Sequence, residues 1–130
     1  MTRDLLADAT TAALAKTLDG VAARHRALAE NIANVDTPGF QRADVSFESE
    51  LKAALKDAQA DPVTAAERIR TVRPRLRRDT TSPARADGNN VDIDREMARL
   101  AQNTTEFEAA ARALATKLRM LRSAISEGKR

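Results

Sequence analysis

The acidic clusters and the single histidine are the residues that could support acid–base or metal chemistry in this 130-residue chain. His25 has neither a cysteine nor a second histidine with which to share a metal ion, whereas a structural zinc site needs about four ligands. Asp92, Asp94 and Glu96 lie where a helix is expected to begin, and the helix dipole favours negative charge there without any catalytic role. We therefore predict that the protein is not an enzyme and has no catalytic, cofactor-binding or metal-ligating residue.

One loop-like segment, residues 87–92, has the oxygen-rich composition of a calcium site. It lacks the bidentate glutamate that closes such a loop at the required distance, so we do not predict calcium binding. The chain also has no glycine-rich phosphate cradle and no nucleophile motif. Because it contains no cysteine, disulfide bonds and thiolate chemistry are excluded.

An arginine-rich segment runs from Arg68 to Arg85, although the net charge of the whole chain is only +3. Such a segment can bind nucleic acid, an anionic lipid surface or an acidic protein face, or it can be a solvated linker. A nucleic-acid-binding helical protein that uses this segment is therefore the alternative function. Against it, no aromatic residue is interleaved with the arginines, and no helix-turn-helix or zinc signature is present.

Both ends of the chain carry apolar residues at alternating spacings of three and four, which is the seam pattern of a coiled coil. In the N-terminal part, the seam residues are Leu14, Leu18, Val21, Leu28, Ile32 and Val35. His25 is the one polar interruption. We predict a helix over residues 1–35 that is frayed at its start, because Ala7 and Thr11 are weak anchors on the same face.

The C-terminal part repeats the pattern over residues 91–127, where we predict a second helix of roughly 50 Å. Asp92 can cap its start and Gly128 can end it. The seam residues are Met97, Leu100, Phe107, Leu114, Leu118, Leu121 and Ile125, with Ile93, Thr104 and Ala111 at the remaining positions.

Two helices with such narrow apolar stripes cannot form a globule alone, so each stripe must be buried against the other or against neighbouring chains. We predict an all-α fold in which the long terminal helices pair as a coiled coil and are joined by an irregular middle segment, all in a single structural unit. A plain helical hairpin with no role in assembly is the alternative, because periodicity alone does not separate the two.

The middle of the chain begins with a turn at residues 37–40, Thr-Pro-Gly-Phe, in which proline fixes φ and glycine accepts a positive φ, as in a type II turn. Within residues 36–60 we predict this turn and a short amphipathic helix that Ser46 caps. Residues 61–90, with three prolines and the arginine-rich segment, are predicted to be an irregular linker that contains one helical fragment capped by Thr64.

The run from Ala29 to Phe40 resembles the signature of the flagellar rod and hook family, an Asn-x-Ala-Asn core followed two residues later by Thr-x-Gly-aromatic. The residues of this motif are Asn31, Ala33, Asn34, Thr37, Pro38, Gly39 and Phe40. A second block, residues 87–97, is similar to the opening of the C-terminal helix in the proximal-rod subunits of this family. The resemblance implies that the motif sets the angle at which the chain leaves its first helix, and hence the contact with the next subunit.

The resemblance also implies a structural subunit of the bacterial flagellar basal-body rod, whose terminal helices form the inner layer of a tube that transmits torque for motility. The implied partners are further copies, the rod proteins FlgC, FlgF and FlgG, and the rod-base adaptor FliE. Export by the flagellar type III apparatus would bring the chain to the periplasm without a cleaved signal peptide. This agrees with the sequence, since no apolar run is long enough for a secretory signal or a membrane span.

Overall fold

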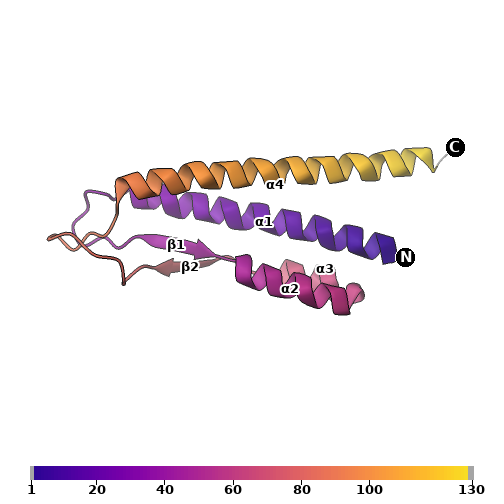
Figure 1. The fold of residues 1–130 in the computed structure, drawn as a ribbon, viewed down its shortest axis with the longest axis horizontal. Helices are drawn as coiled ribbons and strands as arrows, with labels where there is room; N and C mark the ends of the chain where they lie inside the picture. The colour runs from indigo at the N-terminus through magenta and orange to yellow at the C-terminus, as the bar shows by residue number, and fades with distance from the viewer. Residues whose placement is uncertain (1, 129–130) are drawn as a thin grey trace.

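The computed structural model describes residues 2–128, which form four helices and two strands in an elongated molecule (Figure 1). The elements follow the order α1 (Thr2–Ala33), β1 (Ala43–Ser46), α2 (Glu48–Ala60), α3 (Pro62–Thr71), β2 (Arg75–Arg78) and α4 (Ile93–Glu127). α1 and α4 run antiparallel along the molecule, and α1 lies between α4 and the α2–α3 pair (Figure 1). The predicted helical class, with long terminal helices side by side, is confirmed, and one small antiparallel sheet is added to it.

α1 ends at Ala33, two residues before the predicted end, and the turn that follows has the predicted geometry. Gly39 has a φ of 71°, and the Phe40 amide donates to the Thr37 carbonyl at 3.2 Å, as in a type II turn. The proline at the second turn position disfavours a helical conformation for the residue before it, so the helix cannot continue through the motif.

Residues 61–90 contain the predicted helical fragment, which is α3, but the structure differs from the predicted irregular linker because β2 also lies within it. Asp61 caps α3: its carboxylate accepts from the Val63 amide at 3.2 Å and from the Thr64 hydroxyl at 2.6 Å. Thr64, the predicted cap, therefore lies inside the helix. Pro62 occupies the first helical position, where its missing N–H costs no hydrogen bond.

β2 pairs antiparallel with β1, and Ser46 stands opposite Arg75. Ser46 therefore belongs to a strand and does not cap α2, which begins directly after Phe47 without a side-chain cap. Within β1, buried Ala43 and Val45 alternate with exposed residues, as expected for a strand with one face on the protein. Four residues of alternation are too few for the sequence alone to distinguish a strand from a loop.

The hydrophobic core lies between α1 and the α2–α3 pair. Its largest side chain is Phe47, which is 3% exposed and packs directly against Gly20 of α1: a Cβ atom built on Gly20 would lie 2.4 Å from the ring. Small alanine side chains fill much of the rest, which allows the three helices to approach closely. The core residues are Ala9, Ala12, Val21, Ala27, Val45, Phe47, Leu51, Ala54, Ala58, Ala65, Ala66, Ile69 and Val72.

α4 packs against α1 through both polar and apolar residues. Its buried residues, each seven positions after the last, are Glu96, Asn103 and Ala110. On α1, the predicted seam residues Val21 and Leu28 are each only 1% exposed. On α4, the predicted seam residues Leu100 and Leu114 are half-buried, whereas Met97, Phe107, Leu118, Leu121 and Ile125 are largely exposed. None of the helices in residues 2–128 combines the length and hydropathy that a membrane span requires.

Candidate assembly site

Asn31, in the last turns of α1, is fully buried and joins three elements. Its side-chain oxygen accepts from the Ala43 amide and its nitrogen donates to the Ala43 carbonyl, both at 2.8 Å, as a neighbouring strand would do. The same nitrogen donates to Oε2 of Glu96 on α4 at 2.9 Å. Because an amide side chain offers a donor and an acceptor side by side, Asn31 holds both β1 and α4 against α1.

Arg42 and Glu96 form a buried ion pair in which Nε and Oε1 are 2.7 Å apart and the side chains are 8% and 1% exposed. The guanidinium also lies 3.3 Å from the Asp79 carboxylate and 3.5 Å from that of Asp44. Burial by itself would lower the pKa of Arg42, but the hydrogen bond to Glu96 and the nearby carboxylates raise that pKa overall. The guanidinium is therefore held in its charged form between β1, the loop after β2 and α4.

Asn89, in the loop before α4, closes the end of α1. Its side-chain nitrogen donates to the carbonyls of Asn34, Val35 and Thr37 at 2.9, 3.1 and 2.8 Å. Carbonyls at the end of a helix have no partner within the helix, so they need an outside donor of this kind. The Asn89 oxygen accepts from the Val91 amide at 2.8 Å, which orients the side chain toward α1.

Two glycines allow the two sequence blocks to touch. The Gly39 amide donates to the Asp87 carbonyl at 2.8 Å. Gly88 has a φ of 84°, and a Cβ atom built on it would lie only 3.3 Å from the Gly39 Cα. Beside them, the Asn90 side chain accepts from the Arg42 amide at 2.7 Å. The two blocks therefore form one structural unit at the end of the molecule opposite to the termini (Figure 1).

Asp79 organises the loop that follows β2 and leads to this unit. Its carboxylate accepts from the Ser82 hydroxyl at 2.5 Å and from the amides of Thr81 and Ser82 at 2.9 and 3.0 Å. These hydrogen bonds, that of the Ser82 hydroxyl first, hold the pKa of Asp79 far below its ordinary value. Asp79 is therefore a carboxylate at neutral pH, as its ion pair with Arg42 requires.

The predicted motif residues divide into a buried and an exposed group. Asn31 is buried, and Asn34 and Phe40 are half-buried. The Asn34 oxygen accepts from the Thr37 hydroxyl at 3.1 Å, and the Arg78 guanidinium lies 5.3 Å from the centre of the Phe40 ring. The exposed members are Ala33, Thr37, Pro38 and Gly39. The buried part of the motif thus supports the fold, and the exposed part is available for contacts with other chains.

The sequence pattern indicates no role for Arg42, Asn89 and Asn90, and the helix dipole alone accounts for an acidic residue at position 96. The asparagine pair lay inside the second block, and Arg42 followed the first block by two residues. One feature of the sequence could have indicated these residues: charged and amide side chains stand next to segments that are otherwise expected to be buried. Their partners could not be named, because no local pattern points to a contact with a distant segment.

Five of the predicted C-terminal seam residues are largely exposed on α4, and we call them the α4 stripe: Met97, Phe107, Leu118, Leu121 and Ile125, with exposed fractions of 51%, 44%, 51%, 36% and 65%. A shallow groove of about 480 Å³ runs beside Leu118, Leu121 and Ile125 near the end of the helix. His25 of α1 is exposed and lines a second groove of about 350 Å³ together with Phe107. Large apolar side chains in a row are unusual on the surface of a monomer and mark contact sites for other chains.

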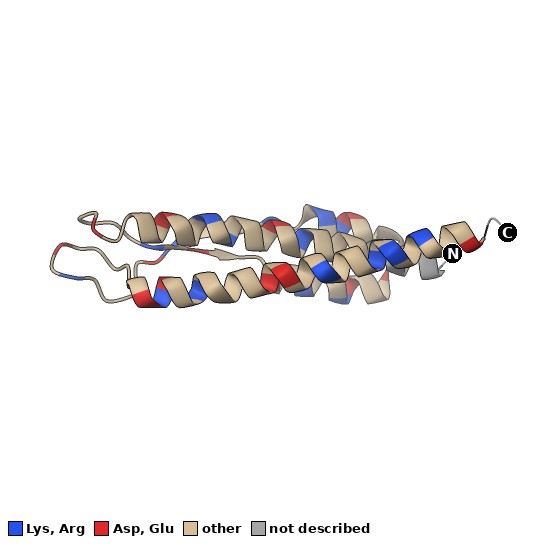
Figure 2. Cartoon of the chain, turned by 90° about the horizontal axis from the view of Figure 1, so that it is seen from above, with Lys and Arg blue, Asp and Glu red and all other residues tan. Residues whose placement is uncertain are grey.

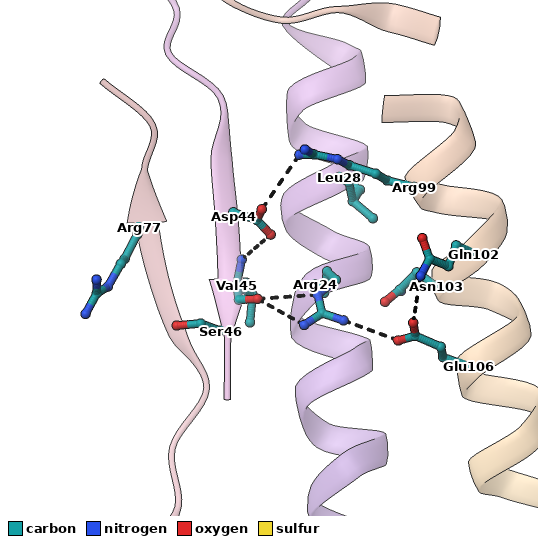
Figure 3. Close-up of a pocket in the computed structure, with 10 residues that line it drawn as sticks. All are labelled: Arg24, Leu28, Asp44, Val45, Ser46, Arg77, Arg99, Gln102, Asn103 and Glu106. Carbon is teal, nitrogen blue, oxygen red and sulfur yellow. Dashed lines mark hydrogen bonds and ion pairs between the residues drawn. The ribbon is translucent and has the colours of Figure 1, made fainter. Parts of the chain in front are cut away.

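A pocket of about 390 Å³ lies between β1, α1 and α4 (Figure 3). Arg24 crosses it: Nε donates to the Val45 carbonyl and Nη1 to the Glu106 carboxylate, both at 3.3 Å. Across the pocket, Arg99 lies 3.7 Å from Asp44. Both carboxylates are thus paired with arginines, so the pocket connects elements rather than presenting a reactive acid or base. In the part of the chain that the structure describes, no cluster of three or more acidic or histidine side chains could hold a metal ion.

The arginine-rich segment 68–85 is partly neutralised within the chain. Arg75 pairs with Glu50 at 2.8 Å, and Arg78 pairs with Glu30 at 3.3 Å. Figure 2 shows basic and acidic residues interspersed along the molecule. Nucleic-acid binding draws its affinity from many phosphate contacts by uncompensated positive charge, and this mixed distribution does not favour it.

Comparison with known proteins decides between the two functions considered above. The chain is 34% identical to the flagellar basal body rod protein FlgB of Yersinia enterocolitica, over 82% of this chain and 86% of that protein. The chain belongs to the FlgB family. It is also 40% identical to FlgB of Borrelia hermsii, over 66% of this chain and 73% of the relative, and 30% identical to FlgB of Escherichia coli strain K12, over 82% and 86%. No family model matches the chain.

Membership of the FlgB family confirms the resemblance seen in the two sequence blocks and makes this chain a flagellar basal body rod protein. In this FlgB-family chain, the blocks are the end of α1 and the approach to α4, held together by the buried asparagines and the Arg42–Glu96 ion pair. The alternative of a nucleic-acid-binding protein has no support.

Proposed function

We propose that this FlgB-family chain is a structural subunit of the proximal flagellar rod, which assembles by helix packing into a tubular shaft that carries torque without catalysis. The observation that carries the proposal is the α4 stripe. In the folded chain, α4 buries Glu96, Asn103 and Ala110 and leaves the large apolar side chains of the α4 stripe exposed.

Leu118, Leu121 and Ile125 of the α4 stripe lie three and four residues apart, a spacing that suits a neighbouring helix. Side chains that recur every three or four residues form a ridge that fits the groove of a second helix. Burying a large apolar side chain completely contributes ~1.5–3 kcal/mol, so a row of half-exposed ones supplies a substantial driving force for association. The partly exposed seam residues of α1, such as Leu14 and Leu18, would add to the same contact.

The motif at the end of α1 has a different role in this proposal. The buried network around Asn31 makes this end of the molecule stiff, because it connects α1, β1 and α4 through short hydrogen bonds. The exposed residues Thr37, Pro38 and Gly39 then present a turn of defined shape. We infer that this turn contacts the next subunit and helps to set the angle between subunits.

The partners that we propose are further copies of the chain, the rod proteins FlgC, FlgF and FlgG, and the rod-base adaptor FliE. The chain would reach the periplasmic part of the basal body through the flagellar type III export apparatus, without cleavage of a signal peptide. The support is the family membership together with the exposed apolar face, which needs covering by other rod components.

The substitution Leu118→Asp tests the proposal, since Leu118 is 51% exposed on the α4 stripe and makes no core contact that its loss would disrupt. A buried unpaired carboxylate strongly disfavours packing, so the variant is expected to be exported normally but to fail to enter the rod, and swimming should stop. Export is measured by the amount of secreted protein, incorporation by its presence in purified basal bodies, and swimming in soft agar.

Ser123→Asp is the matched control, because Ser123 is exposed on α4 but lies on a different side of the helix from Leu118. It should be exported, incorporated and motile. Normal swimming of the Leu118→Asp strain would remove the α4 stripe from the assembly mechanism, and failure of export in that variant would point to an export role instead.

A further inference from the structure

β2 has one open edge. Among residues 2–128 the sheet has two strands, so β2 pairs with β1 on one side, and no described element lies beyond it on the other side (Figure 1). All four residues of β2 are exposed, and Leu76 is 56% exposed. We propose that this edge binds an extended, acidic segment of another protein, which adds a third strand to the sheet.

The alternation of hydrogen bonds along the β1–β2 ladder shows which backbone groups of β2 point away from β1. The Asp79 amide donates to the Arg42 carbonyl directly opposite at 2.8 Å, so this pair is hydrogen-bonded. In an antiparallel ladder, bonded and non-bonded pairs alternate, so Arg77 also bonds to β1, and the N–H and C=O groups of Leu76 and Arg78 point outward. Within residues 2–128 these outward groups have no hydrogen-bond partner.

β1 also has outward-pointing backbone groups at its outer edge, but there side chains of α1 form hydrogen bonds with them. The Ala43 amide and carbonyl bond to the Asn31 side chain, and the Val45 carbonyl accepts from Arg24. One edge of the sheet is thus closed by side chains of α1, whereas the equivalent positions on β2 are open. An open edge of this kind is a template for β-strand addition.

The positive charge of β2 indicates which kind of segment fits its open edge. Arg75 and Arg78 form ion pairs with Glu50 and Glu30, but Arg77 has no ion pair among the described residues. Opposite charges on facing strands are favourable, so an added strand that carries carboxylates fits this edge. Pairing of two β2 edges would place arginines opposite arginines, which is unfavourable, so a second copy of the same strand is not the occupant.

Amide hydrogen exchange measured by NMR tests the proposal directly. In the free protein, the Arg77 amide should exchange slowly, and the Leu76 and Arg78 amides should exchange rapidly. A synthetic peptide of three Glu-Val repeats should slow exchange at Leu76 and Arg78 and leave Arg77 unchanged. The matched control peptides are three Lys-Val repeats and a Glu-Val peptide N-methylated at every residue, which keeps the charge but has no backbone N–H group to donate to β2.

Two variants separate charge from backbone pairing. Arg77→Glu should bind the Glu-Val peptide roughly three- to tenfold more weakly, whereas Arg68→Glu on α3 should bind as the parent chain does. Leu76→Pro removes an outward N–H without removing a ladder bond, so it should keep the β1–β2 pair and lose the peptide.

Three results would overturn the proposal. The first is no protection of Leu76 and Arg78 by the acidic peptide in the folded parent chain. The second is equal binding of the N-methylated peptide, which would mean attraction by charge without an added strand. The third is protection that rises with protein concentration in the absence of peptide, which would mean that copies of the chain occupy the edge.

Discussion

Single residues at the junction of α1, β1 and α4 determine how the two long helices are held. The Arg42–Glu96 ion pair is buried, and its stability depends on both partners being present. Replacement of a buried ion pair by apolar residues is often tolerated, but removal of one partner leaves a buried charge without compensation. Asn31 contacts the same glutamate, so the charge of Glu96 also supports the amide contact to β1.

We therefore expect Glu96→Gln to lower the free energy of unfolding by ~3 kcal/mol, because the Arg42 guanidinium loses its closest counter-charge. Urea denaturation followed by circular dichroism measures this difference. The control is Glu108→Gln, whose side chain is 60% exposed and pairs with Arg112 only at 3.8 Å. Its effect should be ~0–1 kcal/mol. Similar losses in the two variants would show that the buried pair contributes no more than a surface pair.

Among the elements, the α2–α3 pair and α1 form the core, and α4 is attached from the other side. The contact between α1 and α2–α3 relies on small residues, so its geometry is set by how closely the helices approach. At Gly20 the backbone of α1 lies directly against the Phe47 ring, with no room for a side chain. A glycine inside a helix is unfavourable by about 1 kcal/mol relative to alanine, so its presence here indicates that the space is needed.

Gly20→Ala should therefore destabilise the chain by ~1–3 kcal/mol, although alanine has the higher helix propensity, because the added methyl group overlaps the Phe47 ring. Thermal unfolding measures the effect. The double variant Gly20→Ala with Phe47→Leu should lose less than the sum of the two single variants, since the smaller side chain relieves the overlap. Strict additivity, or stabilisation by Gly20→Ala alone, would contradict this packing.

The whole molecule is a rod-shaped unit whose two ends differ. One end carries the buried network and the exposed turn, and the other carries both termini and the exposed end of α4 (Figure 1). From residue 118 onward, every described residue of α4 is exposed. This part of the helix therefore has few tertiary contacts within the chain.

In the isolated chain, amides in residues 118–127 should exchange hydrogen much faster than those in residues 96–110, where the buried contacts to α1 lie. Exchange measured by mass spectrometry on the free protein and on purified rods gives the comparison, and the slow exchange of residues 118–127 should appear only in rods. Sedimentation should find the free chain mostly monomeric. Slow exchange throughout α4 in a dilute monomer would show that the helix is stable without neighbours.

Residues that are close together in the sequence were sufficient to predict several features of this protein. The spacing of apolar residues predicted the two long helices, and Pro38 with Gly39 predicted the turn. The two sequence blocks predicted the family, which the comparisons confirm. These features depend on residues within a few positions of each other, where periodicity and turn preferences act directly.

The tertiary structure alone decided which face of α4 is buried. Glu96 meets Arg42 at a sequence separation of 54 residues, and Asn103 donates to the Val21 carbonyl across 82. An apolar stripe in the sequence indicates that a helix packs against something, but it does not identify the partner. A buried polar side chain, in contrast, is favourable only where a specific hydrogen-bonding or charged group lies beside it. For that reason the buried residues of α4 include Glu96 and Asn103, while the side chains of the α4 stripe stay exposed in the single chain.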